Sequence, residues 1–459
     1  MDLTAHELAA ATGGEIVAGS ADATVTSVTI DSRRLSPGAL FVALKDARDG
    51  HEFLDAAFAG GATVALVDRD VRVSAGATVV KVDDTMVGLT ALAGAARARI
   101  PDAVVVGITG SAGKTATKDL TAAALASSHR VHASPASFNN EAGVPLTLLG
   151  APPDVEVVVT EMGARFPGNI EHLAAMAQPQ VGVITHIGLA HAEHLDGRAG
   201  IAEVKGELLD ALPVDGFAVL NADCDASVAL ARRTQARVVR VGRAPASDVR
   251  ITSVQLDDEL RPRFSLETGW GTADVMLALR GEHQVENAAQ AATVALELGA
   301  PLEAVVSGLA GAQTVNQRME LVRTSQGVLV INDAYNSSPT SAAAAVRSLA
   351  ALDVPGRRVA VLGEMLELGT ESDHEHMALG ALAAEMGIDA VVAVGRPAPQ
   401  IAAGARGGRV IVTTVADPVE ASAFVAGEVH AGDAVLVKAS RAIGLERVAD
   451  DLVHGERVR

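Results

Sequence analysis

Short valine-rich runs, apolar at consecutive positions, alternate along the chain with longer alanine-rich stretches of helical character. A run without polar alternation predicts a strand buried on both faces, and alternation with helices predicts a parallel sheet covered on both sides. In the first part of the chain, such strands are expected at residues 24–30, 40–44, 63–67 and 78–82. The hydrophobic pattern therefore predicts an α/β protein.

A second unit begins after Pro101-Asp102, a pair that ends the preceding helix at Arg99-Ile100. Its parallel strands are expected at residues 103–108, 155–160, 181–185 and 217–221. Residues 247–278 then mix charged residues and glycines in shorter alternation, which predicts an antiparallel extension.

A third unit begins near Met319, and its strand spacing is typical of a doubly wound, nucleotide-binding-like sheet. Its strands are expected at residues 327–332, 358–362, 390–394, 409–413 and 434–438. A length of 459 residues agrees with about three domains of ordinary size. We therefore expect domains at residues 1–100, 101–316 and 317–459.

Charge and aromatic content narrow the range of partners. The chain has 37 Lys and Arg against 56 Asp and Glu, and its net charge of −19 would repel a polyanion, so nucleic acid is not an expected partner. With 8 Phe, 1 Tyr and 1 Trp, stacking platforms for bases are nearly absent. Neither observation argues against a small anionic ligand that is bound through backbone groups.

The cysteine content and the N-terminus bear on the cellular compartment. Cys224 is the only cysteine, which excludes an intramolecular disulfide and a thiolate metal cluster. Met1–Ala10 lacks the cationic start and apolar core of a signal peptide, and no apolar run approaches the roughly 20 residues that cross a bilayer. We expect a cytoplasmic protein without membrane insertion and, as the simplest assumption, a monomer.

The first strand of the second unit runs into a glycine-rich turn and then a helix, an arrangement that can bind phosphate. Gly110 and Gly113 let the backbone curl so that N–H groups converge on phosphate oxygens, and the helix adds its positive N-terminal end. Lys114 would reach the outer phosphates, and the Thr115 hydroxyl a magnesium ion. The general motif would need glycine at Ile108, so a tight turn with a surface lysine is the alternative. Nucleotide binding is the favoured interpretation.

Two further strand ends of the second unit carry candidate ligands. Glu161 follows the expected strand 155–160, and His191 comes shortly after the strand 181–185. Open α/β sheets bind ligands at the carboxyl ends of their strands, and a carboxylate is an oxygen ligand that Mg²⁺ prefers. Taken alone, His191 fits a structural histidine better than a magnesium ligand, and Lys205 has the character of a solvated helix charge.

These motifs, in this order and over nearly the whole chain, resemble the ATP-dependent Mur ligases of peptidoglycan precursor synthesis. The resemblance implies a three-domain α/β architecture. An N-terminal domain would bind a UDP-sugar, a central P-loop ATPase-like parallel sheet would bind ATP and magnesium, and a C-terminal Rossmann-like domain would bind a further ligand. The implied reaction is amide formation through an acyl phosphate, with release of ADP and phosphate.

Within the family, residues 138–147 resemble the branch that joins D-alanyl-D-alanine to UDP-N-acetylmuramoyl-tripeptide, which are therefore the implied partners. The resemblance implies roles in cell wall biogenesis, cell shape and cell division. The substrate-binding residues that it implies are Ser32, Arg33, Asp49, Gly50, His51, Asn139, Asn140 and Glu141.

The resemblance also assigns the nucleotide, metal and catalytic residues. Those implied to bind ATP are Thr109, Gly110, Ser111, Ala112, Gly113, Lys114, Thr115, His283, Asn287, Arg318, Asp333 and Asn336. Two Mg²⁺ ions would be held by Thr115, Glu161, His191 and a carbamylated Lys205. The implied catalytic residues are Lys114, Lys205, His191 and Arg318.

Several positions depart from the family pattern. Gln317 stands before Arg318 where glycine is usual, His186 where asparagine is common, and Ala116 where threonine is usual. Ser337-Ser338 replaces a customary Ala-Asn pair near the amino-acid substrate. These changes bear on substrate preference more than on the reaction, because none removes a charge that catalysis needs.

Other interpretations remain to be weighed. The family's third-residue ligase carries an Asp-Asn-Pro-Arg motif that is missing here, and folylpolyglutamate synthetase has no counterpart of the domain that contains Asp31-Ser32-Arg33. A non-catalytic sensor of UDP-muramoyl peptides would have no need of a second metal. A P-loop switch or motor ATPase is disfavoured because the third unit carries its own nucleotide-facing motif.

Overall fold

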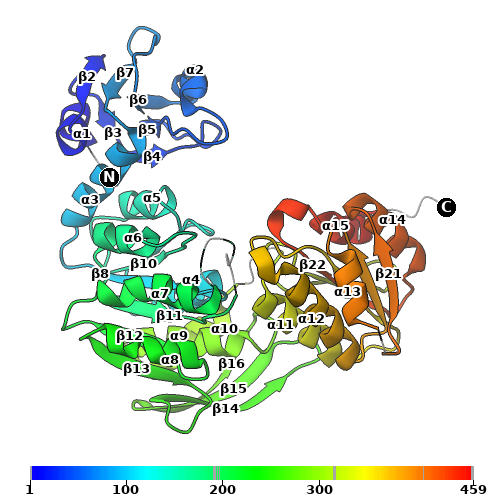
Figure 1. The fold of residues 1–459 in the computed structure, drawn as a ribbon. Coiled ribbons are helices and arrows are strands. Elements are labelled where there is room, and N and C mark those ends of the chain that lie inside the picture. The colour runs from blue at the N-terminus through cyan, green and yellow to red at the C-terminus, as the bar shows by residue number, and fades with distance from the viewer. Residues whose placement is uncertain are drawn as a thin grey trace.

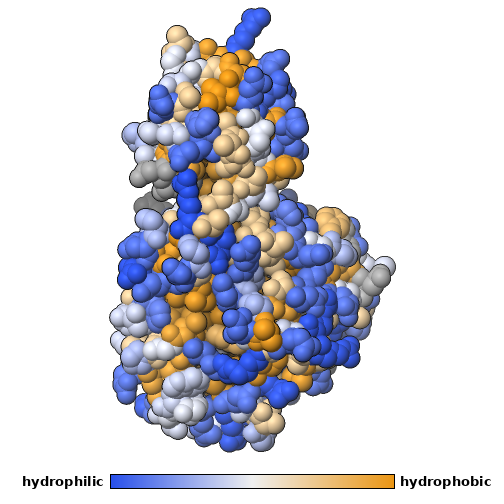
Figure 2. Space-filling model, turned by 90° about the vertical axis from the view of Figure 1, so that its left-hand side faces the viewer, coloured by the Kyte–Doolittle hydropathy of each residue, from blue (hydrophilic) through white to orange (hydrophobic). Residues whose placement is uncertain are grey.

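The computed structural model describes residues 3–189, 193, 195, 197–313, 317–406 and 408–455. Each of three successive units contains its own sheet, and Figure 1 shows the first unit above the second and the third beside it. None of the helices in this part of the chain is long and apolar enough to cross a membrane. The face shown in Figure 2 mixes hydrophilic and hydrophobic positions, with the first unit projecting at the top.

The first unit contains a five-stranded sheet in the order β2-β7-β6-β5-β4. Its strands are β2 (Glu15–Ala18), β4 (Ser27–Thr29), β5 (Ala39–Val42), β6 (Ala62–Val67) and β7 (Thr78–Lys81), and a small pair is formed by β1 (Leu3–Thr4) and β3 (Thr24–Val25). Its helices are α1 (Ala5–Thr12), α2 (Leu54–Ala59) and α3 (Thr85–Ala98). A capping box between Thr4 and Glu7 starts α1, and Asp84 caps α3.

The second unit contains a nine-stranded sheet in the order β16-β15-β14-β13-β12-β11-β8-β10-β9. Its strands are β8 (Val104–Thr109), β9 (Val131–Ala133), β10 (Val157–Glu161), β11 (Val181–Ile184), β12 (Phe217–Asn221), β13 (Arg237–Gly242), β14 (Val249–Leu256), β15 (Pro262–Thr268) and β16 (Gly271–Met276). The seven strands β8 to β14 are parallel to one another, and β15 and β16 extend the sheet in antiparallel fashion.

Helices cover both faces of this sheet, as the doubly apolar strands require. Val105 and Val106, adjacent on β8, belong to different hydrophobic clusters because successive side chains of a strand point to opposite faces. One face packs against α4 (Lys114–Leu125), α9 (Gln284–Glu297) and α10 (Leu302–Gly311). The other packs against α5 (Gly143–Gly150), α6 (Asn169–Ala177) and α7 (Gly197–Asp210), and α8 (Asp225–Ala229) follows β12.

The third unit contains a six-stranded sheet in the order β17-β18-β22-β19-β20-β21, parallel except for β17. Its strands are β17 (Glu320–Arg323), β18 (Leu329–Asn332), β19 (Arg358–Leu362), β20 (Ala390–Val394), β21 (Ile411–Val415) and β22 (Ala434–Lys438). Its helices are α11 (Pro339–Ala351), α12 (Ser372–Glu385), α13 (Ala398–Gly404), α14 (Pro418–Glu428) and α15 (Glu446–His454). Figure 1 shows α11 on the side that faces the second unit.

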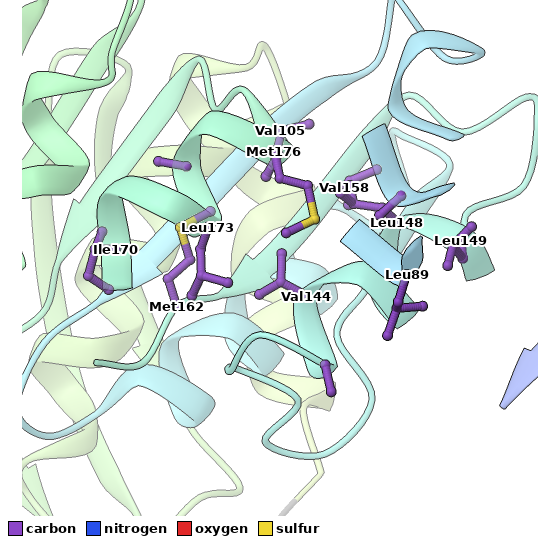
Figure 3. Close-up of a cluster of buried hydrophobic side chains, with 14 of the residues drawn as sticks. Leu89, Val105, Val144, Leu148, Leu149, Val158, Met162, Ile170, Leu173 and Met176 are labelled. Atoms are coloured by element: carbon purple, nitrogen blue, oxygen red, sulfur yellow. The ribbon is translucent and has the colours of Figure 1, made fainter. Parts of the chain in front are cut away.

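The first unit is joined to the second through α3. Leu89 on α3 shares a buried cluster with Val144 and Leu148 of α5, and Figure 3 shows these side chains with Val158 and Met176. Because this core is continuous, we expect the first unit to be held in place on the second.

The α/β class, the parallel strands and the antiparallel extension at residues 247–278 are confirmed. The pattern missed the short edge strands β2, β9 and β17 and the strand β13, in which exposed positions interrupt the apolar run. The expected strand 24–30 is divided into β3 and β4. The domain limits 1–100, 101–316 and 317–459 stay a proposal.

Candidate active site

A cleft of about 660 Å³ lies between the second and third units. From the second unit it is lined by the turn after β8 and the ends of β10 and β11, and from the third by residues near β18 and the start of α11. Carboxyl ends of parallel strands from two sheets therefore meet at one cavity, the place where open α/β sheets bind ligands.

The turn between β8 and α4, residues 110–113, is shaped by close backbone packing. Gly113 has φ of 84°, and a Cβ at this position would clash with Asn287 Oδ1. Gly110 has φ of 151°, and a Cβ there would clash with Thr185 Oγ1. Both positions require glycine, because a side chain would meet atoms that pack against the turn. The predicted phosphate loop is thus a backbone-lined concavity at a helix N-terminus.

Neighbouring strands tie this loop down. Ser111 donates its backbone N–H to the carbonyl of His186 at 2.7 Å, and its hydroxyl to the carbonyl of Gly188 at 2.6 Å. Thr185 Oγ1 donates to the carbonyl of Ala112 at 2.6 Å. Lys114 Nζ turns back to the carbonyl of Gly110 at 2.8 Å, and burial lowers the pKa of Lys114. Thr109, which ends β8, is fully buried.

The oxygen atoms expected to hold magnesium lie together at the first turn of α4. Thr115 Oγ1 donates to Glu161 Oε2 at 2.7 Å, and Asn139 Nδ2 donates to Glu161 Oε1 at 2.7 Å. Glu161 is 1% exposed at the end of β10, directly beside β8 in the sheet. A hydroxyl and a carboxylate in contact suit a hard cation that keeps several waters, so these residues fit Mg²⁺. Among the described residues, no group of three His, Cys, Asp or Glu could hold a metal.

Lys205 lies on α7 and is 2% exposed, so its interpretation as a solvated helix charge is wrong. Burial, together with the positive charge of Lys114, lowers the pKa of Lys205 to about 7. None of the ion pairs among the described residues involves its ammonium group. His191, its expected metal partner, lies outside the described residues. With this pKa, a substantial fraction of the lysine is the neutral amine near neutral pH, whereas an ordinary lysine is almost entirely charged.

Arg318 brings a positive charge from the third unit into the cleft. Its Nη2 lies 3.2 Å from Thr115 Oγ1 and 3.2 Å from Ser137 Oγ, and its guanidinium lies over the ring of Tyr335 at 4.2 Å from the centroid. Its Nε has no hydrogen-bond partner among the described atoms. Gln317, on one side of Arg318, has φ of 59°, a left-handed conformation that explains why glycine suits this position.

Two further third-unit residues line the cleft as expected. Asp333 Oδ2 lies 2.7 Å from Lys438 Nζ, and its Oδ1 accepts the backbone N–H of Met319 at 3.1 Å. The carbonyl of Asn336 accepts from Lys438 Nζ at 2.8 Å. Lys438 is buried and fixes the backbone that follows β18.

His283 and Asn287 lie at the start of α9, and both line the cleft. Asn287 Oδ1 accepts from Thr117 Oγ1 at 3.3 Å, and Asn287 Nδ2 donates to Gln284 Oε1 at 3.0 Å. Burial lowers the pKa of His283, so its ring is neutral near neutral pH. The contact with Thr117 joins α9 to α4, the helix that follows the phosphate loop.

The expected substrate residues fall into two places. Asn139, Asn140 and Glu141 line the cleft, and Glu141 Oε1 accepts from Asn169 Nδ2 at 3.1 Å. The remaining ones, Ser32, Arg33, Asp49, Gly50 and His51, lie in the first unit and are not among the residues that line the cleft.

Contacts of these first-unit side chains are local. Arg33 is exposed and pairs with Asp31 at 2.9 Å. The ring of His51 is buried between Asp49, at 2.7 Å from Nδ1, and Asp68, whose backbone N–H donates to Nε2 at 3.2 Å. His51 therefore shapes this loop from within.

Several residues of the cleft region are not among the site residues predicted from the sequence. Ser137 and Tyr335 line the cleft, and Lys118 is buried behind Ser137. The lysine stands four residues after Lys114, on the same face of α4, and that helical spacing is the signal that could have drawn attention to it.

Comparison with known proteins defines the class of this chain, an ATP-dependent amide ligase. Family models match residues 24–112 (Mur ligase family, catalytic domain), 108–295 (Mur ligase middle domain) and 317–441 (Mur ligase, glutamate ligase domain). The chain belongs to the Mur ligase family.

Curated relatives and solved structures agree with this assignment. The UDP-N-acetylmuramoyl-tripeptide–D-alanyl-D-alanine ligase of Mycobacterium tuberculosis is 41% identical, over 99% of this chain and 98% of its own, and the ligase of that name from Escherichia coli is 35% identical over 98% of both. A crystal structure of MurF from Acinetobacter baumannii covers 99% of both chains with 30% identity and a TM-score of 0.88. MurF from Thermotoga maritima in complex with ADP covers 93% of this chain and 96% of its own, with 30% identity and a TM-score of 0.78.

Proposed function

We propose that this chain joins D-alanyl-D-alanine to UDP-N-acetylmuramoyl-tripeptide, with consumption of ATP, in the synthesis of peptidoglycan. The proposal is carried by one observation: Arg318 of the third unit contacts Thr115 of the phosphate loop inside a cleft lined by both units. Full-length relatives that are named for this reaction support the substrates. The third-residue ligation of the same family and a non-catalytic sensor role are the competing functions.

In this proposal, ATP would supply the phosphoryl group that activates the terminal carboxylate of the tripeptide as an acyl phosphate. The loop from Thr109 to Thr115 would hold the phosphates through its backbone N–H groups. Lys114 and Arg318 would face the outer phosphate from opposite units and neutralise its charge. The other nucleotide-binding residues proposed are His283, Asn287, Asp333 and Asn336.

Magnesium would be held at two places. Thr115 and Glu161, already in contact, supply the oxygen atoms for the first ion. For the second we propose His191 and a carbamylated Lys205. The amine of Lys205 would add to carbon dioxide and lose a proton, giving an anionic carbamate in place of a cation. Burial of Lys205 supports this, because the lowered pKa leaves the amine free to react.

The substrate would span the molecule. Ser32, Arg33, Asp49, Gly50 and His51 of the first unit would bind the UDP-sugar, and Asn139, Asn140 and Glu141 would face the peptide where it enters the cleft. Because these places belong to different units, sugar binding and ATP binding should be separable. We further propose that the protein acts as a monomer in the cytoplasm, without membrane insertion, and serves cell wall growth and division.

The test is product formation followed by mass spectrometry. The protein is incubated with ATP, Mg²⁺ and UDP-N-acetylmuramoyl-tripeptide, together with D-alanyl-D-alanine or with single D- or L-amino acids. We expect a product heavier than the tripeptide substrate by the dipeptide minus one water, and ADP only when the dipeptide is present. A parallel incubation contains UDP-N-acetylmuramoyl-dipeptide and a diamino acid, and turnover there would favour the third-residue ligase. Binding without any product would favour the sensor.

A further inference from the structure

Lys118 is a buried cation that no role described above uses. It lies on α4 one turn after Lys114 and is 2% exposed. Its Nζ donates to the carbonyls of Ser134 and Ala136 at 2.7 and 2.8 Å and lies 2.8 Å from Asp119 Oδ1. An ammonium has three N–H donors, and burying it is costly unless they are satisfied. Here all three have partners, two of which are backbone carbonyls of a single turn.

The turn that Lys118 holds, residues 134–137, follows β9 and has an unfavourable backbone. Ala136 has φ of 47°, the left-handed region that a residue with a Cβ seldom adopts. Carbonyls two residues apart converge on one Nζ, so the lysine compensates for this conformation. Ser134 is fixed from its other side, because its Oγ accepts from Thr147 Oγ1 at 3.1 Å and from the backbone N–H of Glu161 at 3.3 Å.

The turn places Ser137 at the meeting point of the second and third units. Ser137 Oγ lies 3.3 Å from Thr115 Oγ1, 3.2 Å from Arg318 Nη2 and 3.2 Å from Tyr335 Oη. A hydroxyl has one donor and two acceptor lone pairs. The Ser137 hydroxyl can therefore accept from Arg318 and Tyr335 and donate to Thr115. All three of its possible hydrogen bonds are then made.

We propose that Ser137 is the hydroxyl through which the third unit docks on the phosphate loop, and that Lys118 is the positioning residue that holds Ser137 in place. Lys118 binds two carbonyls of the turn, and the turn places Ser137 at the cleft. Ser137 Oγ in turn contacts the guanidinium of Arg318 and holds it beside Thr115. The docking part depends only on the structure. Its kinetic consequence rests on the proposed function, because Arg318 acts on phosphate only if the cleft binds ATP.

The composition of the chain supplies a direct probe. Tyr335 is the only tyrosine, so the full-length protein labelled with 3-fluorotyrosine gives a single ¹⁹F resonance from the docking contact itself. The variants are Ser137→Ala, Ser137→Thr, Lys118→Met and the double variant Lys118→Met/Ala136→Gly. Thr121→Val is the matched control. It removes a buried hydrogen bond, from Thr121 Oγ1 to the carbonyl of Thr117, on the same helix about one turn from Lys118.

We expect Ser137→Ala and Lys118→Met to shift the resonance in the same direction, and Ser137→Thr and Thr121→Val to leave it near the wild-type position. Glycine adopts the left-handed conformation without cost. The resonance of the double variant should therefore lie between those of Lys118→Met and the wild type. An unshifted resonance in Ser137→Ala would overturn the docking role, and an unshifted one in Lys118→Met the positioning role. If Lys118→Met does not fold, Lys118→Gln, which keeps a shorter donor, is measured in its place. A shifted ¹⁹F resonance then supports the positioning role of Lys118, and an unshifted one overturns it.

Kinetics with the complete substrate mixture give the second readout. Loss of hydrogen bonds to a charged group predicts that Ser137→Ala and Lys118→Met lose roughly tenfold or more in kcat/KM for ATP. Ser137→Thr should restore most of it, and the KM of the UDP-sugar substrate should stay unchanged. If the wild-type protein made no product, the proposed function would fail, whereas the ¹⁹F comparison would still decide the docking proposal.

Discussion

Thr115 Oγ1, in the first turn of α4, donates a 2.7 Å hydrogen bond to Glu161 Oε2 at the end of β10. The threonine is the second residue of the helix after the phosphate loop, and the glutamate at the end of β10 is 1% exposed. Asn139 Nδ2 donates to the other carboxylate oxygen, Oε1, so both oxygens of Glu161 are held in place. This pair marks the point in the cleft where a cation would meet phosphates held by the loop.

Glu161→Gln should lower ADP formation roughly a hundredfold, because it removes the anionic ligand while keeping the size of the side chain. The Mg²⁺ concentration at half-maximal rate should rise. The neighbouring Thr160 is a matched control, since its buried hydroxyl has no partner among the described atoms. Thr160→Val should keep its activity and gain stability of up to about 1 kcal/mol in urea unfolding. An equal loss of activity in both variants would contradict a specific role of Glu161.

Gly113→Ala should abolish nucleotide binding in calorimetry, because its Cβ would meet Asn287 at a backbone φ of 84°. The matched control is Gly94, which lies on α3 with open space around its Cβ position. Gly94→Ala should bind nucleotide normally and be more stable by about 0.5–1 kcal/mol. Wild-type ADP affinity in Gly113→Ala would refute the phosphate-loop assignment.

Lys114→Ala should lose ATP-dependent phosphate release and keep its affinity for the UDP-sugar substrate, because the residues proposed for these ligands lie in different units. Isothermal titration with each ligand separately checks this. A parallel loss of UDP-muramoyl peptide binding would show that the two sites are not separate.

Lys205→Ala should be inactive, because the proposed carbamate could no longer form. Acetate should restore part of the activity, since its carboxylate fits the space that truncation leaves. Lys205→Arg is the control, because it leaves no such space and should not respond to acetate. Full activity of Lys205→Ala without acetate would exclude the carbamate.

Asp49 should make the first unit sensitive to acid. The hydrogen bond to His51 lowers the pKa of Asp49 from 3.8 to about 2. Because the folded-state pKa is the lower one, the stability that Asp49 contributes is complete above about pH 4 and is lost as the pH falls through 2. The difference in urea midpoint between wild type and Asp49→Asn should therefore shrink below pH 4. A difference that stays constant down to pH 2 would contradict this.

Much of the fold could be predicted because its strands are apolar on both faces. The runs 103–108, 217–221 and 434–438 coincide with β8, β12 and β22 to within one residue. In the missed strand β13, exposed arginines interrupt the buried positions, and β9 has only three residues. Neither carries a continuous apolar run.

The candidate site was predicted where chemistry follows from local spacing. The loop from Gly110 to Thr115 and the strand end at Glu161 lie together as expected. Ser137 and its contact with Tyr335 were missed because this contact joins positions 198 residues apart, and nothing local marks it. Lys205 was interpreted as solvated because one helical charge has the same local pattern whether it faces water or the interior.

The most direct measurement follows oxygen from the tripeptide to phosphate. UDP-N-acetylmuramoyl-tripeptide, with both oxygens of the reacting carboxylate labelled with ¹⁸O, is incubated with the protein, ATP, Mg²⁺ and D-alanyl-D-alanine, and the released phosphate is analysed by mass spectrometry. Activation of the carboxylate predicts one ¹⁸O per phosphate and one retained in the new amide, with release dependent on the dipeptide. Phosphate without label, or release that does not depend on the dipeptide, would contradict the account.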